Sequence, residues 1–97
     1  GVKVVEFTEK RITVPISILH LPKNMNIFPY PQKVNIKFQV SIEEFDEISN
    51  DHFTVVSDFG KINVAQGEKL KVELLDTPPD IKNLTFSPQE IEYLIIN

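Results

Sequence analysis

Apolar and polar residues alternate without interruption along residues 33–42. Every second side chain is apolar, and the side chains between them are polar. The apolar positions are Val34, Ile36, Phe38, Val40 and Ile42. Because successive side chains of a β-strand point to opposite faces of the sheet, this period of two predicts a strand with one buried and one solvated face.

The period changes directly after this strand. Ile42, Phe45 and Ile48 follow one another at intervals of three, which is a helical spacing. Residues 41–44 have the form Ser-x-x-Glu, in which a serine hydroxyl and a glutamate carboxylate cap the first turn of a helix. We therefore predict one short helix at residues 42–49.

Other segments show the same strand alternation, bounded by glycine, proline or asparagine. The further predicted strands are residues 2–7, 12–18, 53–59, 70–74 and 90–96. Pro15 has no amide to donate, so it places the strand at 12–18 at a sheet edge or gives it a bulge. The strand at 90–96 ends in apolar residues on both faces. We expect either that both faces are covered or that its edge pairs with another domain or a second copy.

A short repeat relates the two halves of the chain. Residues 16–22 match residues 72–78 at an offset of 56, and residues 26–32 match residues 83–89 at an offset of 57. Each copy consists of a strand, a proline, a crossing segment and a strand headed by Pro-Gln. The prolines favour an extended path, polyproline-like or β, through the first crossing. Two such units cannot stack as a solenoid. We expect them to face each other across a pseudo-twofold axis, with residues 42–68 inserted between them.

These patterns define one fold class. We predict a mainly β, single-domain barrel or sandwich that spans residues 1–97, with six or seven strands, the one short helix and the pseudo-twofold repeat. A chain of 97 residues is long enough to bury one core without disulfides. It has no cysteine, which excludes disulfides and thiolate metal sites. Its net charge of −4 opposes a phosphate backbone, so we expect no nucleic-acid partner.

The sequence offers little equipment for catalysis. It has no nucleophile-elbow, dinucleotide-binding or phosphate-loop motif. His20 and His52 could bind a metal if the fold brought them together, but they lack metal-ligand spacing, and we expect both to be exposed loop residues. The densest acidic run is Glu43, Glu44, Asp46, Glu47 and Asp51. It lacks the order of a calcium loop, so we interpret it as a solvated face, with recognition of a partner as the alternative. We predict no catalytic, cofactor-binding or metal-binding residues.

The first crossing segment carries large apolar side chains. Met25, Phe28 and Tyr30 either close one end of the barrel or form an exposed patch that binds a partner. End closure is the commoner role of such residues. A denaturation midpoint that Phe28→Ala leaves unchanged would contradict it.

Several short motifs together resemble the YbbR-like domain family. They are Val14-Pro15, Leu21-Pro22, Pro31-x-x-Val34, Val56-x-Asp58-Phe59, Lys69-Leu70-x-Val72, Pro78-Pro79 and Ser87-Pro88-x-x-Ile91-Glu92-Tyr93. The resemblance covers residues 11–97. It implies a small β-rich domain, often in tandem behind a transmembrane helix, outside the bacterial cytoplasm. In some members it implies regulation of a membrane diadenylate cyclase. This chain departs from the pattern in holding one copy and in its acidic helix.

From the resemblance and the lack of catalytic motifs we expect a non-enzymatic interaction, regulatory or spacer module, excised from a longer membrane-anchored protein of the cell envelope. An unidentified protein is its expected partner. The alternative is a ligand-binding or RNA-binding β-domain, because the family fold is similar to the β-domain of a ribosomal-RNA-binding protein. Basic side chains gathered on one surface would favour that alternative.

Overall fold

The computed structural model describes residues 4–96, which form eight strands and four short 3₁₀ helices. The strands are β1 Phe7–Pro15, β2 Ser17–Leu19, β3 Asn26–Tyr30, β4 Lys33–Ser41, β5 Thr54–Asp58, β6 Leu70–Asp76, β7 Lys82–Ser87 and β8 Glu90–Ile96. The helices are η1 Ile42–Glu47, η2 Asn50–His52, η3 Phe59–Lys61 and η4 Val64–Gln66. None of these helices is long and apolar enough to span a membrane.

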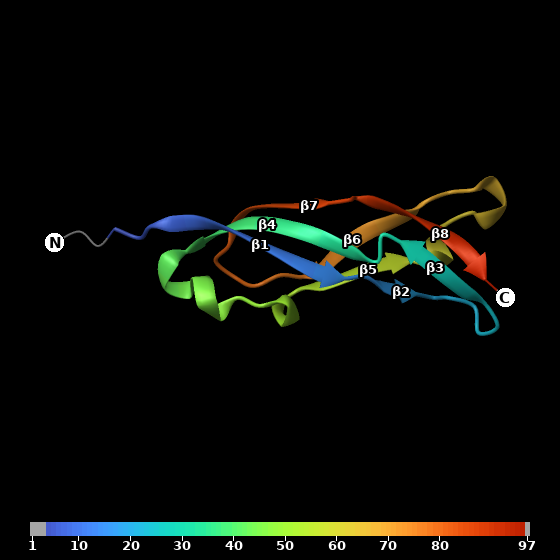
Figure 1. Ribbon diagram of the computed structural model, residues 1–97, viewed down its shortest axis with the longest axis horizontal. Helices are drawn as coiled ribbons and strands as arrows, with labels where there is room; N and C mark the ends of the chain where they lie inside the picture. Colours follow the sequence, from blue (N-terminus) through green and yellow to red (C-terminus); the bar gives the residue numbers. More distant parts are fainter. Residues whose placement is uncertain (1–3, 97) are drawn as a thin grey trace.

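The strands form two sheets that follow one another along the molecule (Figure 1). The first sheet has the order β1-β4-β7, and the second has the order β2-β5-β6-β8-β3. The molecule is elongated, with extents of 63 × 21 × 17 Å and a radius of gyration of 16.7 Å. A compact domain of this length has a radius of about 13 Å. The described chain begins at one end of the long axis and ends at the other.

The pseudo-twofold repeat is present in the pairing of the strands. β4 of the first half pairs with β7 of the second, and β8 of the second half pairs with β3 of the first, both antiparallel. The registers are equivalent: Tyr30 pairs with Glu92, and Asn35 pairs with Ser87. These are the same two positions of the repeat, 57 residues apart and with the roles exchanged. The expected twofold arrangement of the arms is therefore confirmed.

The same hydrogen bond closes the turn into each proline-headed strand. In the first half the Ile16 amide donates to the Gln32 carbonyl at 2.9 Å. In the second half the Val72 amide donates to the Gln89 carbonyl, also at 2.9 Å. The prolines that precede the two glutamines both follow cis peptide bonds. Equivalent backbone groups in the two halves therefore make equivalent hydrogen bonds.

The core lies on the inward faces of the alternating strands. Val34, Ile36, Phe38 and Val40 on β4 are at most 1% exposed, as the period of two predicted. Leu70 and Ile91 complete the core from the other half of the chain. Because one face of β4 is fully buried, a shift of its register by one residue would turn these side chains into water.

Most predicted elements are present at nearly the predicted bounds. The predicted strands at 53–59, 70–74 and 90–96 are β5, β6 and β8. The predicted helix at 42–49 is the 3₁₀ helix η1, which ends at Glu47, and Ser41 Oγ accepts from the Glu44 amide as its N-cap at 3.3 Å. The crossing segment around Phe28 takes the β alternative as β3.

Three details of the sequence-based prediction were wrong. Residues 4–6 lie outside any strand, since β1 begins at Phe7; residues 2 and 3 of that predicted strand lie outside the described part of the chain. The predicted strand at 12–18 is divided at Ile16 into β1 and β2, which belong to different sheets. This division and the two crossing strands raise the number from six or seven to eight. The expectation that Pro15 lies at a sheet edge is confirmed, because within the described part of the chain β1 pairs with β4 alone.

A pair of leucines on β6 tests this assignment of the core. Leu70 is fully buried, whereas Leu75 on the same strand is 57% exposed. We expect Leu70→Ala to lower the free energy of unfolding by about 2 to 5 kcal/mol, because it leaves a cavity between the two halves. Leu75→Ala is the matched control and should change it by about 0.5 kcal/mol or less. Urea denaturation of the three proteins measures both values, and equal losses would contradict the assignment.

Candidate functional site

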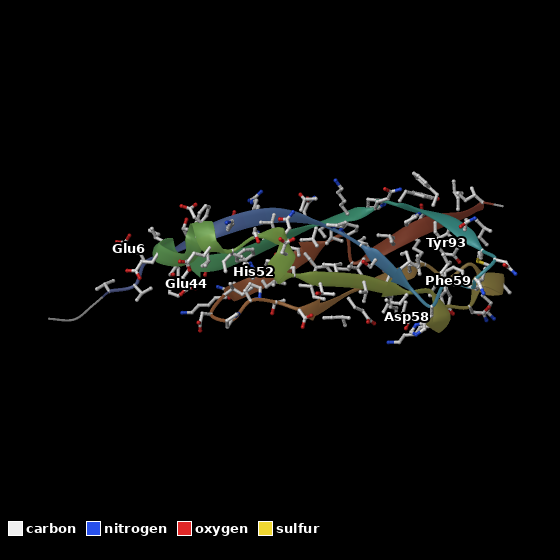
Figure 2. The ribbon with its side chains drawn as sticks, turned by 90° about the horizontal axis from the view of Figure 1, so that it is seen from below. Glu6, Glu44, His52, Asp58, Phe59 and Tyr93 are labelled. Atoms are coloured by element: carbon white, nitrogen blue, oxygen red, sulfur yellow. The ribbon has the colours of Figure 1, made fainter. Side chains whose placement is uncertain are left out.

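The two histidines lie apart and have separate structural partners. His52 caps η2: its Nδ1 accepts from the Ser49 amide at 3.0 Å. His20 follows β2 with a φ of 58° and bonds Asp58 at the end of β5, with 2.8 Å between His20 Nδ1 and Asp58 Oδ1. Figure 2 shows His52 midway along the molecule and Asp58 toward the C-terminal end. The structure therefore does not bring the two imidazoles together.

The bond between His20 and Asp58 ties two loops together, and the sequence-based prediction missed it. Asp58 Oδ1 also accepts from the Gly60 amide at 2.9 Å, which caps η3. A side chain at Gly60 would place its Cβ 3.0 Å from the Cβ of His20, so the two loops approach closely. The hydrogen bond with His20 lowers the pKa of Asp58 below its ordinary value, and the Gly60 amide lowers it further. The only signal in the sequence was Asp58 in the motif Val56-x-Asp58-Phe59.

Most of the acidic run lies on η1, toward the N-terminal end of the molecule, where Figure 2 shows Glu6 and Glu44, and Asp51 follows on η2. Lys10 packs against η1 from β1. Its Nζ donates to the Phe45 carbonyl and, at 2.7 Å, to the Ile48 carbonyl, and it lies 4.5 Å from the centre of the Phe45 ring. Within residues 4–96, no three His, Asp or Glu side chains are grouped as metal ligands would be.

Of the three apolar residues on the first crossing, only Met25 packs against the core. Phe28 and Tyr30 are 47% and 39% exposed, so end closure was the wrong interpretation for these two side chains. They lie on β3, whose inward positions are Ile27 and Pro29 instead. The alternation of β3 decides the matter, because Phe28 and Tyr30 both belong to its outward face.

Strand pairing joins these exposed side chains into one surface. Across β3 and β8, Phe28 stands opposite Leu94 and Asn26 stands opposite Ile96, so their side chains share one face of the ribbon. Leu94 is 55% exposed and Ile96 is 50% exposed. We call the four residues Phe28, Tyr30, Leu94 and Ile96 the outward apolar face. A contiguous apolar surface of this kind marks an interaction site more often than scattered single residues do.

The other face of this ribbon packs against η3. Tyr93 meets the Phe59 ring edge to face, with 5.6 Å between the ring centres and 75° between the planes. Figure 2 shows both side chains near the C-terminal end. Beside β8 runs an open groove of about 380 Å³, between that strand and the loop that carries Val64 and Gly67. Glu92, Tyr93, Leu94 and Ile95 form its β8 side, and Tyr30 of β3 also lines it.

Comparison with known proteins gives one informative likeness. No family model matches the chain, and no curated protein matches it in sequence. Among solved structures, the crystal structure of a YbbR-like domain from Listeria monocytogenes superposes with a TM-score of 0.68. The match covers 91% of this chain and 92% of that chain, at 16% sequence identity. The chain has the YbbR-like fold. The resemblance drawn from the short motifs is thus confirmed at the level of fold.

A stability measurement separates the outward apolar face from the core of the YbbR-like fold. We expect Phe28→Ala to lower the free energy of unfolding by less than about 1 kcal/mol, since half of the ring is already in water. Phe38→Ala is the matched comparison: its ring is 1% exposed, and its loss should cost about 3 to 5 kcal/mol. Guanidinium denaturation measures both free energies of unfolding. If Phe28→Ala lowered the free energy as much as Phe38→Ala does, Phe28 would belong to the core and would close one end of the domain.

The lowered pKa of Asp58 predicts a pH dependence. A carboxyl whose pKa is lower in the folded state than in the unfolded state stabilises the fold above the unfolded pKa, and this contribution is lost as the pH falls through the folded pKa. We therefore expect Asp58→Asn to lower the thermal midpoint at neutral pH. The difference from the unmodified chain should shrink below the ordinary carboxyl value of 3.8. Thermal melts from pH 7 to pH 2 provide the measurement, and a constant difference would contradict the interpretation.

Proposed function

We propose that this chain is a non-enzymatic interaction and spacer module of a cell-envelope protein, and that its outward apolar face binds a protein partner. The observation that carries the proposal is the exposure of Phe28, Tyr30, Leu94 and Ile96 on one side of a single two-stranded ribbon. Aromatic and large aliphatic side chains of this kind act as anchors in protein interfaces.

The geometry of the chain ends supports the spacer role. The described chain enters at one end of the 63 Å axis and leaves at the other (Figure 1). A domain threaded in this way adds its whole length to the distance between the segments before and after it. The outward apolar face lies next to the exit, on β3 and β8, so a partner bound there would be held at a set distance from any anchor upstream.

Location and partner follow from the resemblance to YbbR-like domains. From it we infer a parent protein that lies outside the cytoplasm and is anchored to the membrane, and we take a membrane diadenylate cyclase as the first partner to test. The alternative of an RNA-binding β-domain gains less support. Arg11 and Lys37 stand opposite each other on β1 and β4, but Glu9 neutralises Arg11 at 2.8 Å, and the chain as a whole is acidic.

Cyclic di-AMP output tests the partner assignment. We expect co-expression of the membrane-anchored chain with a membrane diadenylate cyclase to change the cellular amount of cyclic di-AMP. Phe28→Asp should return that amount to the level without the chain, because a charge cannot be buried in an apolar interface without a partner. Leu75→Asp, at a site of similar exposure on β6, is the control and should behave as the unmodified chain. An amount of cyclic di-AMP that the chain does not alter would contradict the cyclase as partner.

A further inference from the structure

The pseudo-twofold repeat leaves one strand position unfilled. In the first half, β1 pairs with β4 along its whole length, from Phe7 opposite Ser41 to Pro15 opposite Lys33. In the second half, β6 takes the place of β1, but within the described residues it pairs with β8 at two positions only, Leu70 with Ile91 and Lys71 with Glu90. Among residues 4–96, the rest of β8 has β3 on one side and no strand on the other.

The repeat identifies which residues of β8 lack a neighbour. Tyr93 and Ile95 correspond to Ile36 and Phe38 of β4 at the offset of 57. β1 places Ile12 opposite Ile36 and Lys10 opposite Phe38. The residues of the second half that would match this part of β1 lie in η4 and the turn after it, where Gly67 has a φ of 69°. The groove beside β8 is the space that this strand would fill.

Two observations show that the backbone groups of Tyr93 and Ile95 point into this groove. The Val72 amide bonds the Gln89 carbonyl, so odd-numbered residues of β8 turn their N–H and C=O toward β6. On the other side, Tyr93 stands opposite Pro29, which has no N–H, so this pair is the kind that does not exchange hydrogen bonds with β3. Both observations indicate that the odd-numbered residues of β8 turn their backbone groups away from β3 and toward the groove. The open edge thus presents two donors and two acceptors.

We propose that the open edge of β8 pairs with the same edge of a second copy of this chain, antiparallel and about a twofold axis at Leu94. In this register Tyr93 of each copy exchanges two hydrogen bonds with Ile95 of the other, which uses all the groups that the edge presents. Leu94 meets its own counterpart in the close, non-hydrogen-bonded pair. The result is a four-stranded ribbon of β3, β8 and their two symmetry mates.

The charges of the segment suit this occupant. Residues 93–96 carry no charge, and the register sets Glu92 opposite Ile96 of the other copy, so no like charges meet. Glu92 already has Lys69 at 3.8 Å in its own chain. A contact about a twofold axis uses the same surface on both copies, so it ends in a closed dimer. A strand from the opposite end of another copy would instead leave a free edge on each copy and give an open chain.

The small area of this interface predicts a low affinity between the two copies. A specific interface buries about 800 Å² on each partner, and one short strand edge with its flanking side chains falls below this. We therefore expect a weak dimer that dissociates on dilution. Sedimentation velocity over a concentration series up to about 1 mM should show monomer and dimer in rapid exchange. A chain that stays monomeric throughout, or one that forms an open series of larger oligomers, would overturn the proposal.

Substitutions at the edge locate the contact. Ile95→Pro removes a donor that points into the groove and costs β3 no hydrogen bond, so it should raise the dimer dissociation constant by at least about tenfold while the chain stays folded. Leu94→Lys should do the same, because the axis places two lysines side by side. Leu75→Lys, at 57% exposure away from the edge, is the control and should dimerise as the unmodified chain does.

A charge swap tests the axis itself. Leu94→Lys and Leu94→Glu should each be monomeric alone and form a heterodimer when mixed, since position 94 meets itself only in this register. Circular dichroism checks that each variant is folded, and amide exchange at residues 93 and 95 should slow in the mixture. A mixture that remains monomeric, while the unmodified chain dimerises, would overturn the proposed axis.

Discussion

The antiparallel pairing of β4 with β7, repeated by β8 with β3, is the constraint on which the rest of the structure depends. It links the two halves of the chain through hydrogen bonds that neither half can make alone. It also sets the apolar faces of β4 and β8 toward one interior, where Val34, Ile36 and Ile91 exclude water. Because side chains alternate along every strand, this one register decides which residues become core and which become surface.

The proposed binding surface lies where the two halves stop being equivalent. β1 covers the whole edge of β4, but β6 covers only the start of β8, so the ribbon of β3 and β8 extends beyond β6. The outward apolar face and the open edge both belong to this extension. The face offers side chains and the edge offers backbone groups, and the two adjoin at Tyr30 and Leu94, which belong to the outward apolar face and also line the groove. The proposed partner on the face and the proposed second copy on the edge would therefore both contact Leu94.

The fold class, the repeat and most strands could be predicted because they depend on local alternation and on prolines, whose effects act within a few residues. The division of one strand between two sheets at Ile16 could not be predicted. It follows from the hydrogen bond between the Ile16 amide and Gln32, and no local pattern encodes that bond. The bond between His20 and Asp58 was missed for the same reason, since 38 residues separate the pair in the chain.

By itself, the sequence determined that this protein is a small β-domain with two related arms, a buried face on β4 and no catalytic motif. Only the tertiary structure decided which apolar residues remain in water. Phe28, Leu94 and Ile96 are as apolar as Ile36 or Ile91, and no local period separates them. They are exposed because the pairing of β3 with β8 turns these positions to the outer face of the ribbon, and which face of a strand meets the core is decided only in the packed molecule.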